Sequence, residues 1–121
     1  MITREQQRAQ AAYGKITAVK PQPWGEDYGR QCLHLPALIH QCGLCQALTF
    51  LEAKAVKKPE CGKLLADVLA AAGLGSTGAV RGAEVGEYQR MTRDALACAQ
   101  WFKRYAEAIL KVEAGGEERR A

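Results

Sequence analysis

Apolar residues recur every three or four positions along most of this chain, which is the spacing of one face of an α-helix. Between residues 3 and 20 that face consists of Ala9, Ala12, Tyr13, Ile16 and Val19. Thr3 suits the position that caps a helix start, and Pro21 cannot continue a helix. The pattern therefore predicts a first helix that ends just before Pro21.

The same periodicity predicts further helices over residues 30–41, 44–55, 60–72 and 84–112. Gly43 and Pro59 separate neighbouring segments, and Pro36 marks either the first turn of a new helix or a kink in a continuous one. The last helix is the longest, with a core face of Tyr88, Ala95, Ala99, Phe102, Ala106 and Ile109.

The segments between these helices are rich in glycine, proline and polar residues. Residues 21–29 are expected to form a loop, in which Trp24 and Tyr28 either hold the loop down or offer an exposed surface for stacking or for docking a partner. Residues 73–83 are predicted to be the most flexible internal segment. Residues 114–121 are predicted to be a flexible C-terminal tail.

Composition favours the same fold class. The chain has 121 residues, with 21 Ala and 12 Leu against only 6 Val and 4 Ile, and strands prefer β-branched residues. The sequence thus predicts an all-α protein, a single compact bundle of five to six helices over residues 1–113 with a long C-terminal helix. No apolar run approaches the length of a membrane span and the first residues are polar, so we expect a cytoplasmic protein with no membrane partner.

The net charge of +4 is informative only through its placement. At roughly 100° per residue, four basic residues of the last helix share a strip opposite its core face: Arg90, Arg93, Arg104 and Lys111. Arg4, Arg8 and Lys15 share a face of the first helix. Two such strips can follow a phosphate backbone, although an ordinary solvated surface shows the same pattern.

Catalytic and cofactor motifs are missing. Cys42 and Cys45 form a C-x-x-C pair without a second pair, so we expect neither a metal site nor any other cofactor. Cys45 lies where a helix begins, a position that favours a moderately reactive thiol. No nucleophile–base arrangement or phosphate-binding loop is present, and we expect no enzyme activity. Asp67, within an apolar helix, is interpreted as a carboxylate at the helix edge.

Three segments resemble the small helical subunit of type III-B (Cmr-type) CRISPR effector complexes. The central one runs from Leu35-Pro36-Ala37-Leu38-Ile39 through Gly43-Leu44 and Gln46-Ala47-Leu48 to Phe50 and Lys54. The first helix contributes Gln7-Arg8-Ala9 and Ala12, and the last helix Tyr88, Thr92, Ala95-Leu96, Trp101, Arg104 and Ala106. The order and spacing of the three segments carry the resemblance.

The resemblance implies a non-catalytic subunit that stacks into a filament and lines the channel holding the guide RNA–target RNA duplex. It suggests Lys54 and Arg104 as RNA contacts. With the two basic strips, the residues predicted to contact sugar-phosphate are Arg8, Lys15, Arg30, Lys54, Arg90, Arg93, Arg104 and Lys111. Trp24 and Trp101 are predicted to meet other subunits, including further copies of this chain. The alternatives are a helical protein–protein adaptor without nucleic-acid contact and a thiol or zinc module.

Overall fold

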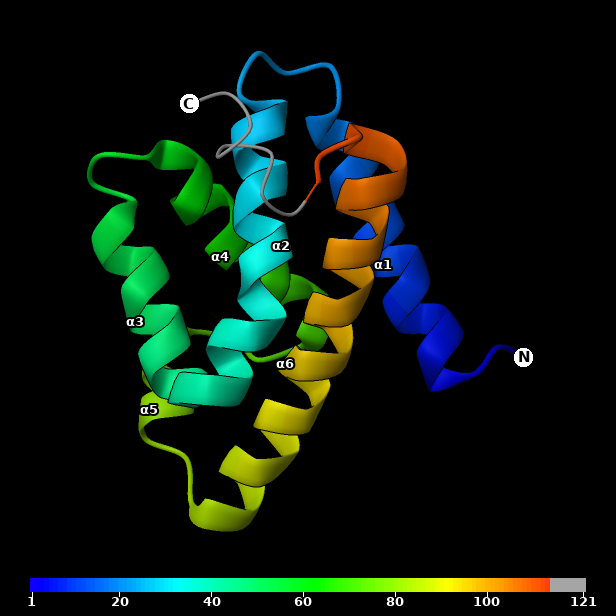
Figure 1. Cartoon of the computed structure of the whole chain (residues 1–121). Helices are drawn as coiled ribbons and strands as arrows, with labels where there is room; N and C mark the ends of the chain where they lie inside the picture. The colour runs from blue at the N-terminus through cyan, green and yellow to red at the C-terminus, as the bar shows by residue number, and fades with distance from the viewer. Residues whose placement is uncertain (114–121) are drawn as a thin grey trace.

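The computed structural model describes residues 1–113, which form six α-helices and one short π-helical segment. The helices are α1 (Arg4–Val19), α2 (Gly25–Cys42), α3 (Leu44–Lys54), α4 (Pro59–Ala72), α5 (Thr77–Arg81) and α6 (Val85–Tyr105), followed by η1 (Ala106–Leu110). They pack into one bundle (Figure 1), and the described residues contain no strand. The predicted all-α bundle is confirmed, while the predicted tail over 114–121 lies outside the described residues.

The start of α1 follows its sequence signal. The Thr3 hydroxyl accepts a hydrogen bond from the Gln6 backbone N–H at 3.1 Å, and the Gln6 side chain accepts one from the Thr3 N–H at 2.7 Å. This reciprocal capping box pairs donors that a helix start leaves open. The helix ends at Val19, just before Pro21 as predicted.

The second helix begins at Gly25, so the prediction of a loop over 21–29 is wrong for most of that segment. The physical reason is Tyr28, which is fully buried and continues the core face of Cys32, Leu35 and Ile39 one turn toward the N-terminus. Pro36 lies inside this single helix and is buried.

The segment 73–83 also holds more structure than predicted. The Ser76 hydroxyl accepts a hydrogen bond from the Ala79 N–H at 3.0 Å and so caps the short helix α5. Val80 of this helix is 1% exposed and packs into the core. A capped helix with a buried anchor therefore occupies the middle of the segment.

The long last helix changes form near its end. After Tyr105 the chain continues as the π-helical segment η1, which has more residues per turn than an α-helix. The wider turn brings Leu110 and Val112 into the core, while Ile109 is only partly buried. The prediction of one α-helix as far as Val112 is therefore wrong beyond Tyr105.

Helix α6 runs diagonally between α2 and α1 in the view of Figure 1, and it packs against α2, α1 and α4. The largest fully buried side chains come from α1, α2, α3, α4, α5 and α6, among them Ile16, Tyr28, Leu48, Leu64, Val80 and Phe102. No described helix is both long enough and apolar enough to cross a membrane. The arrangement fixes the faces of α1 and α6 relative to each other.

Two buried groups with acidic protons, the Tyr28 hydroxyl and the Cys32 thiol, are expected to make the fold less stable at alkaline pH. Burial raises the pKa of the Tyr28 hydroxyl and of the Cys32 thiol above their ordinary values, so both stay protonated in the folded protein. The unfolded chain releases these protons above about pH 9, and folding stability then falls by about 1.4 kcal/mol per pH unit for each ionised group. We expect urea unfolding to show this fall between about pH 8.5 and 10.5.

The Cys32→Ala variant provides the control, because it removes one of the protons that burial retains. Its free energy of unfolding should fall less steeply with pH than that of the parent. Parallel pH profiles for the two proteins would contradict the prediction.

Candidate nucleic-acid interface

The outer face of α6 carries two exposed arginines. Arg93 and Arg104 are exposed and lie opposite the buried Ala95, Ala99 and Phe102. They are eleven positions apart, which is about 16 Å along a helix axis. Within residues 1–113, neither guanidinium forms an ion pair with a carboxylate. We call Arg93, Gln100 and Arg104 the α6 strip.

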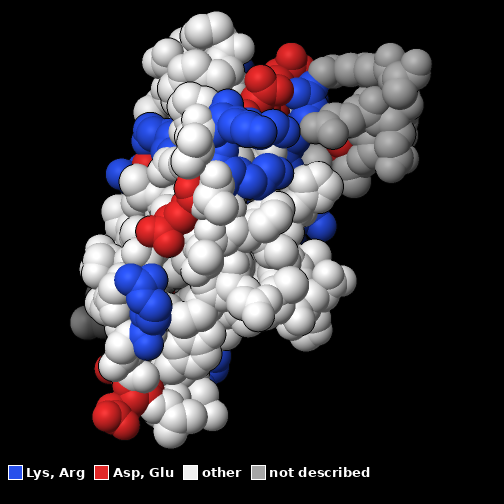
Figure 2. Space-filling view, turned by 90° about the vertical axis from the view of Figure 1, so that its left-hand side faces the viewer, with Lys and Arg blue, Asp and Glu red and all other residues white. Residues whose placement is uncertain are grey.

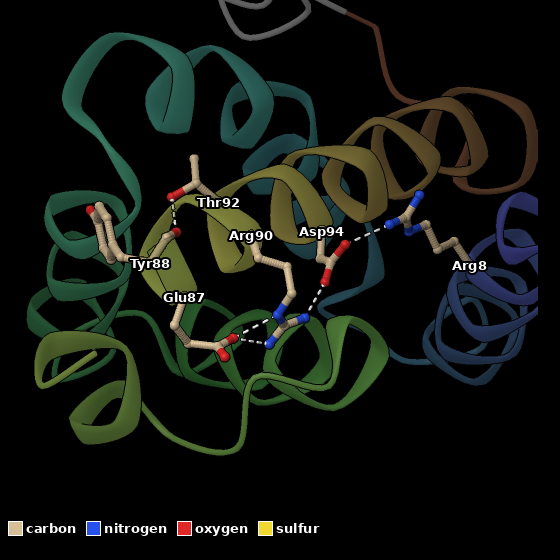
Figure 3. Close-up of polar contacts among 6 residues, drawn as sticks. All are labelled: Arg8, Glu87, Tyr88, Arg90, Thr92 and Asp94. Atoms are coloured by element: carbon tan, nitrogen blue, oxygen red, sulfur yellow. Dashed lines mark hydrogen bonds and ion pairs between the residues drawn. The ribbon is translucent and has the colours of Figure 1, made fainter. Parts of the chain in front are cut away.

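Two further predicted RNA contacts, Arg8 and Arg90, form ion pairs with carboxylates (Figure 3). Arg8 Nη2 donates to Asp94 Oδ1 at 2.6 Å, and Arg90 Nη1 donates to Asp94 Oδ2 at 2.5 Å. Arg90 Nε also donates to Glu87 Oε1 at 2.6 Å. Asp94 thus joins an arginine of α1 to an arginine of α6 and neutralises part of their charge.

Lys15 and Arg30 are likewise placed beside carboxylates. Arg30 is 9% exposed, and its Nη1 donates to Asp27 Oδ1 at 2.8 Å. Lys15 Nζ lies 4.0 Å from Asp67 Oδ1. Asp67 is not at a helix edge as interpreted from the sequence, because it is 3% exposed and accepts hydrogen bonds from Tyr28 Oη at 2.7 Å and Lys63 Nζ at 2.5 Å.

Lys111 does not lie on the last helix. It follows η1 with a φ of 61°, the left-handed conformation that often ends helices, and it is exposed. The predicted strip of four basic residues therefore keeps three on α6, and Arg90 among these is paired.

A second basic surface lies at the turn between α3 and α4. Figure 2 shows Lys and Arg side chains gathered over the upper part of the face that carries α3. Lys54, Lys57 and Lys58 are at this turn, and we call them the lysine cluster. Lys54 Nζ lies 4.9 Å from the ring centre of the exposed Phe50. The run Lys54 to Lys58 in the sequence signals this cluster, although only Lys54 was predicted as a contact.

Three aromatic rings meet between α1 and the end of α6. The rings of Trp101 and Tyr105 stack with centres 5.5 Å apart, and Tyr13 of α1 meets Tyr105 edge-on, also at 5.5 Å. The Arg104 guanidinium lies 5.8 Å from the Trp101 ring centre. Trp24 stands apart from this group at the start of α2, where its ring lies 6.2 Å from that of Tyr28.

Comparison with known proteins identifies the family of this fold and surface. A family model described as "CRISPR-associated protein (Cas_Cmr5)" matches residues 4–109. The chain is 42% identical over 114 residues to the "CRISPR system Cmr subunit Cmr5" of Thermus thermophilus, with 92% of this chain and 99% of that protein covered. The chain belongs to the Cmr5 family.

A crystal structure from the same family has the same architecture. The CRISPR-associated Cmr5 family protein from Thermus thermophilus superposes with a TM-score of 0.84 at 37% identity. The superposition covers 91% of this chain and 99% of that one. The resemblance to the small subunit of Cmr-type effector complexes is thereby confirmed.

Two residues that carry the Cmr5 resemblance, Gly43 and Tyr88, hold the junction of α2 and α3. Gly43 takes a φ of 85° between α2 and α3, and the Tyr88 hydroxyl accepts a hydrogen bond from the Cys45 N–H at 2.9 Å, where α3 lacks a capping side chain of its own. By contrast, Arg104 is exposed and Lys54 partly so. These two positions are the ones that the family resemblance suggested as RNA contacts.

The five cysteines of this Cmr5 family protein divide by burial. Cys32, Cys61 and Cys98 are buried, and burial raises the pKa of each thiol. Cys42 is exposed and Cys45 partly exposed, at the junction of α2 and α3. Among residues 1–113 no three metal-ligating side chains come together.

Thiol labelling should follow this division. With an aromatic disulfide reagent, we expect Cys42 to react first, Cys45 next, and the three buried thiols only at the rate of local or global opening. In denaturant all five should react at once. Mass-spectrometric mapping of the labelled peptides checks the order, and early labelling of Cys32 in the native protein would contradict it.

Proposed function

We propose that this chain is a non-catalytic structural subunit of a type III-B CRISPR effector ribonucleoprotein that acts in antiviral defence. In it, copies of the chain stack into a filament and contact the backbone of the guide RNA–target RNA duplex. Its partners are then the guide RNA, the target RNA, the other subunits and further copies of itself, in the cytoplasm. Membership of the Cmr5 family supports the assembly, since the match spans residues 4–109.

The observation that carries the RNA contact is the α6 strip. Arg93 and Arg104 face away from the core with no carboxylate partner among the described residues, so both guanidiniums are available to a phosphate. Phosphate contacts position a protein on nucleic acid without reading sequence. This suits a subunit that must accept any guide.

The other predicted RNA contacts differ in whether a carboxylate lies beside the basic side chain. Lys54, together with its neighbours Lys57 and Lys58, adds a second cationic surface. Lys111 is exposed beyond η1. Carboxylates lie beside the other four, Arg8, Lys15, Arg30 and Arg90. Each of these four should therefore contribute less free energy to the binding of a phosphate.

The test replaces both arginines of the α6 strip in the assembled complex. Removing one phosphate-binding side chain should reduce the salt slope of RNA binding by about 0.9 and the affinity by about fivefold near 0.15 M salt. We therefore expect Arg93→Gln/Arg104→Gln to bind target RNA roughly 25-fold more weakly than the parent, as measured by filter binding over a salt series.

A matched control removes the same charge elsewhere. Arg81→Gln/Lys20→Gln changes two exposed cations of α5 and the end of α1, and it should bind RNA nearly as the parent does. If the two double variants bind alike, the α6 strip does not contact RNA. If photocrosslinking within the complex then joins this chain to protein alone, it acts as a helical adaptor.

A further inference from the structure

The cluster of Tyr13, Trp101 and Tyr105 is placed as a surface feature and not as part of the core. Tyr13 is 52% exposed, and Trp101 and Tyr105 are partly buried at the edge of the core. The rings come from α1 and α6, which pack side by side (Figure 1). The stacking of Trp101 on Tyr105 accounts for those two rings, but it leaves most of Tyr13 facing water.

The charge beside the cluster selects among ligands. Arg104 lies over the Trp101 ring and has no carboxylate partner within the described residues. A cationic ligand, such as a methylated lysine, would be repelled by the guanidinium. A purely aliphatic ligand would leave it unpaired. An aromatic ring that carries a negative charge fits both features, and a nucleobase joined to its phosphate is such a group.

We propose that Tyr13, Trp101 and Tyr105 form a stacking site for an unpaired nucleobase of single-stranded RNA, with Arg104 binding the adjoining phosphate. The inference rests on the proposed RNA contact and deepens it. It also assigns to Trp101 an RNA contact in place of the subunit contact that the sequence predicted. Arg93, on the same face of α6, would receive a phosphate farther along the strand.

The site is restricted to unpaired bases because both faces of a base inside a duplex are already covered by its neighbours. Aromatic stacking accepts any base, since each has a π-face. The site would therefore hold a nucleotide extruded from the duplex or lying beyond its end, irrespective of sequence.

Tryptophan fluorescence reports on this site directly. The chain has two tryptophans, so the Trp24→Phe variant leaves Trp101 as its single tryptophan, which is excited selectively at wavelengths that tyrosine does not absorb. We titrate this variant, as the full chain at about 10 mM salt, with a short oligoadenylate, an abasic ribose-phosphate of equal length and an RNA duplex. The oligoadenylate should quench Trp101 saturably, while the abasic strand and the duplex should bind with little quenching.

A matched pair of substitutions tests the role of Tyr13. In the Trp24→Phe background, Tyr13→Leu should weaken oligoadenylate binding by about tenfold, the loss expected for one stacked base, and leave duplex binding unchanged. Phe50→Leu removes another aromatic ring of similar exposure, 45%, on a different helix, but it leaves the Lys54 charge in place and should weaken oligoadenylate binding far less. Thermal unfolding of both variants checks that each remains folded.

Three results would overturn the stacking site. The first is an unchanged Trp101 emission with oligoadenylate, and the second is equal quenching by the abasic strand. The third is a Tyr13→Leu variant that binds oligoadenylate as tightly as Phe50→Leu does. This holds even if Tyr13→Leu fails to join other subunits, because the cluster would then be a protein contact. The proposed function is judged separately, because duplex binding in the complex depends on Arg93 and Arg104 whether or not a base stacks.

Discussion

The Asp67→Ala variant is expected to unfold with a free energy about 3 kcal/mol lower than that of the parent protein. Asp67 is 3% exposed and accepts hydrogen bonds from Tyr28 and Lys63, which link α4 to α2 and hold a charge pair within α4. Its removal leaves the hydroxyl of the fully buried Tyr28 without its acceptor and deprives Lys63 of its counter-charge. Urea unfolding at pH 7 measures the loss.

A double-mutant cycle separates the orphaned hydroxyl from the charge pair. Tyr28→Phe keeps the ring but removes the donor, so Asp67→Ala should cost at least about 1 kcal/mol less in that background than in the parent. Strictly additive costs would show that the bond between Tyr28 and Asp67 does not contribute to stability.

At the start of α2, the spacing of apolar residues did not predict the helix that the structure contains. Gly25 and Gly29 resemble turn residues in the sequence, but both lie in the helix at close contacts. A Cβ at Gly29 would lie 3.1 Å from side-chain atoms of Leu110 and Val112, and one at Gly25 would lie 3.0 Å from the Val19 carbonyl oxygen. A glycine required for close packing and a glycine required for a turn are the same letter in a sequence.

The helices that were predicted well have signals that are local. Residues 44–55 and 60–72 begin or end within about a residue of α3 and α4, because Gly43, Pro59 and Gly73 act on their own neighbours. The π-helical segment has no such local signal. It accompanies the packing of Leu110 and Val112 against α2. Because of this segment, Lys111 does not continue the predicted strip of basic residues on α6.

The candidate site likewise has features that follow from a single helix and features that follow only from packing between helices. Projection at 100° per residue placed Arg93 and Arg104 outward, since that depends on α6 alone. The four-residue spacing of Arg90 and Asp94 could have indicated their ion pair. The bond between Arg8 and Asp94 joins residues 86 positions apart, and only the packing of α1 on α6 reveals it. The same holds for Tyr13 beside Tyr105.

If Asp94 holds two arginines away from RNA, its neutralisation should strengthen binding. In Asp94→Asn, Arg8 and Arg90 lose the carboxylate that accepts from both, though Arg90 keeps Glu87. Each arginine that gains a phosphate contact should raise RNA affinity by about fivefold near 0.15 M salt and steepen the salt slope by about 0.9. Arg8 should account for most of the gain, because Asp94 is its one carboxylate partner within residues 1–113.

The control must change the net charge equally without freeing an arginine. Glu107→Gln does so, because Glu107 is exposed on η1 and forms no ion pair with the described residues. Its effect on RNA binding should be a small gain without a steeper salt slope. Asp94→Asn/Arg8→Gln should return the affinity close to that of the parent. Equal gains in Asp94→Asn and Glu107→Gln would mean that overall charge, and not the release of Arg8, governs binding.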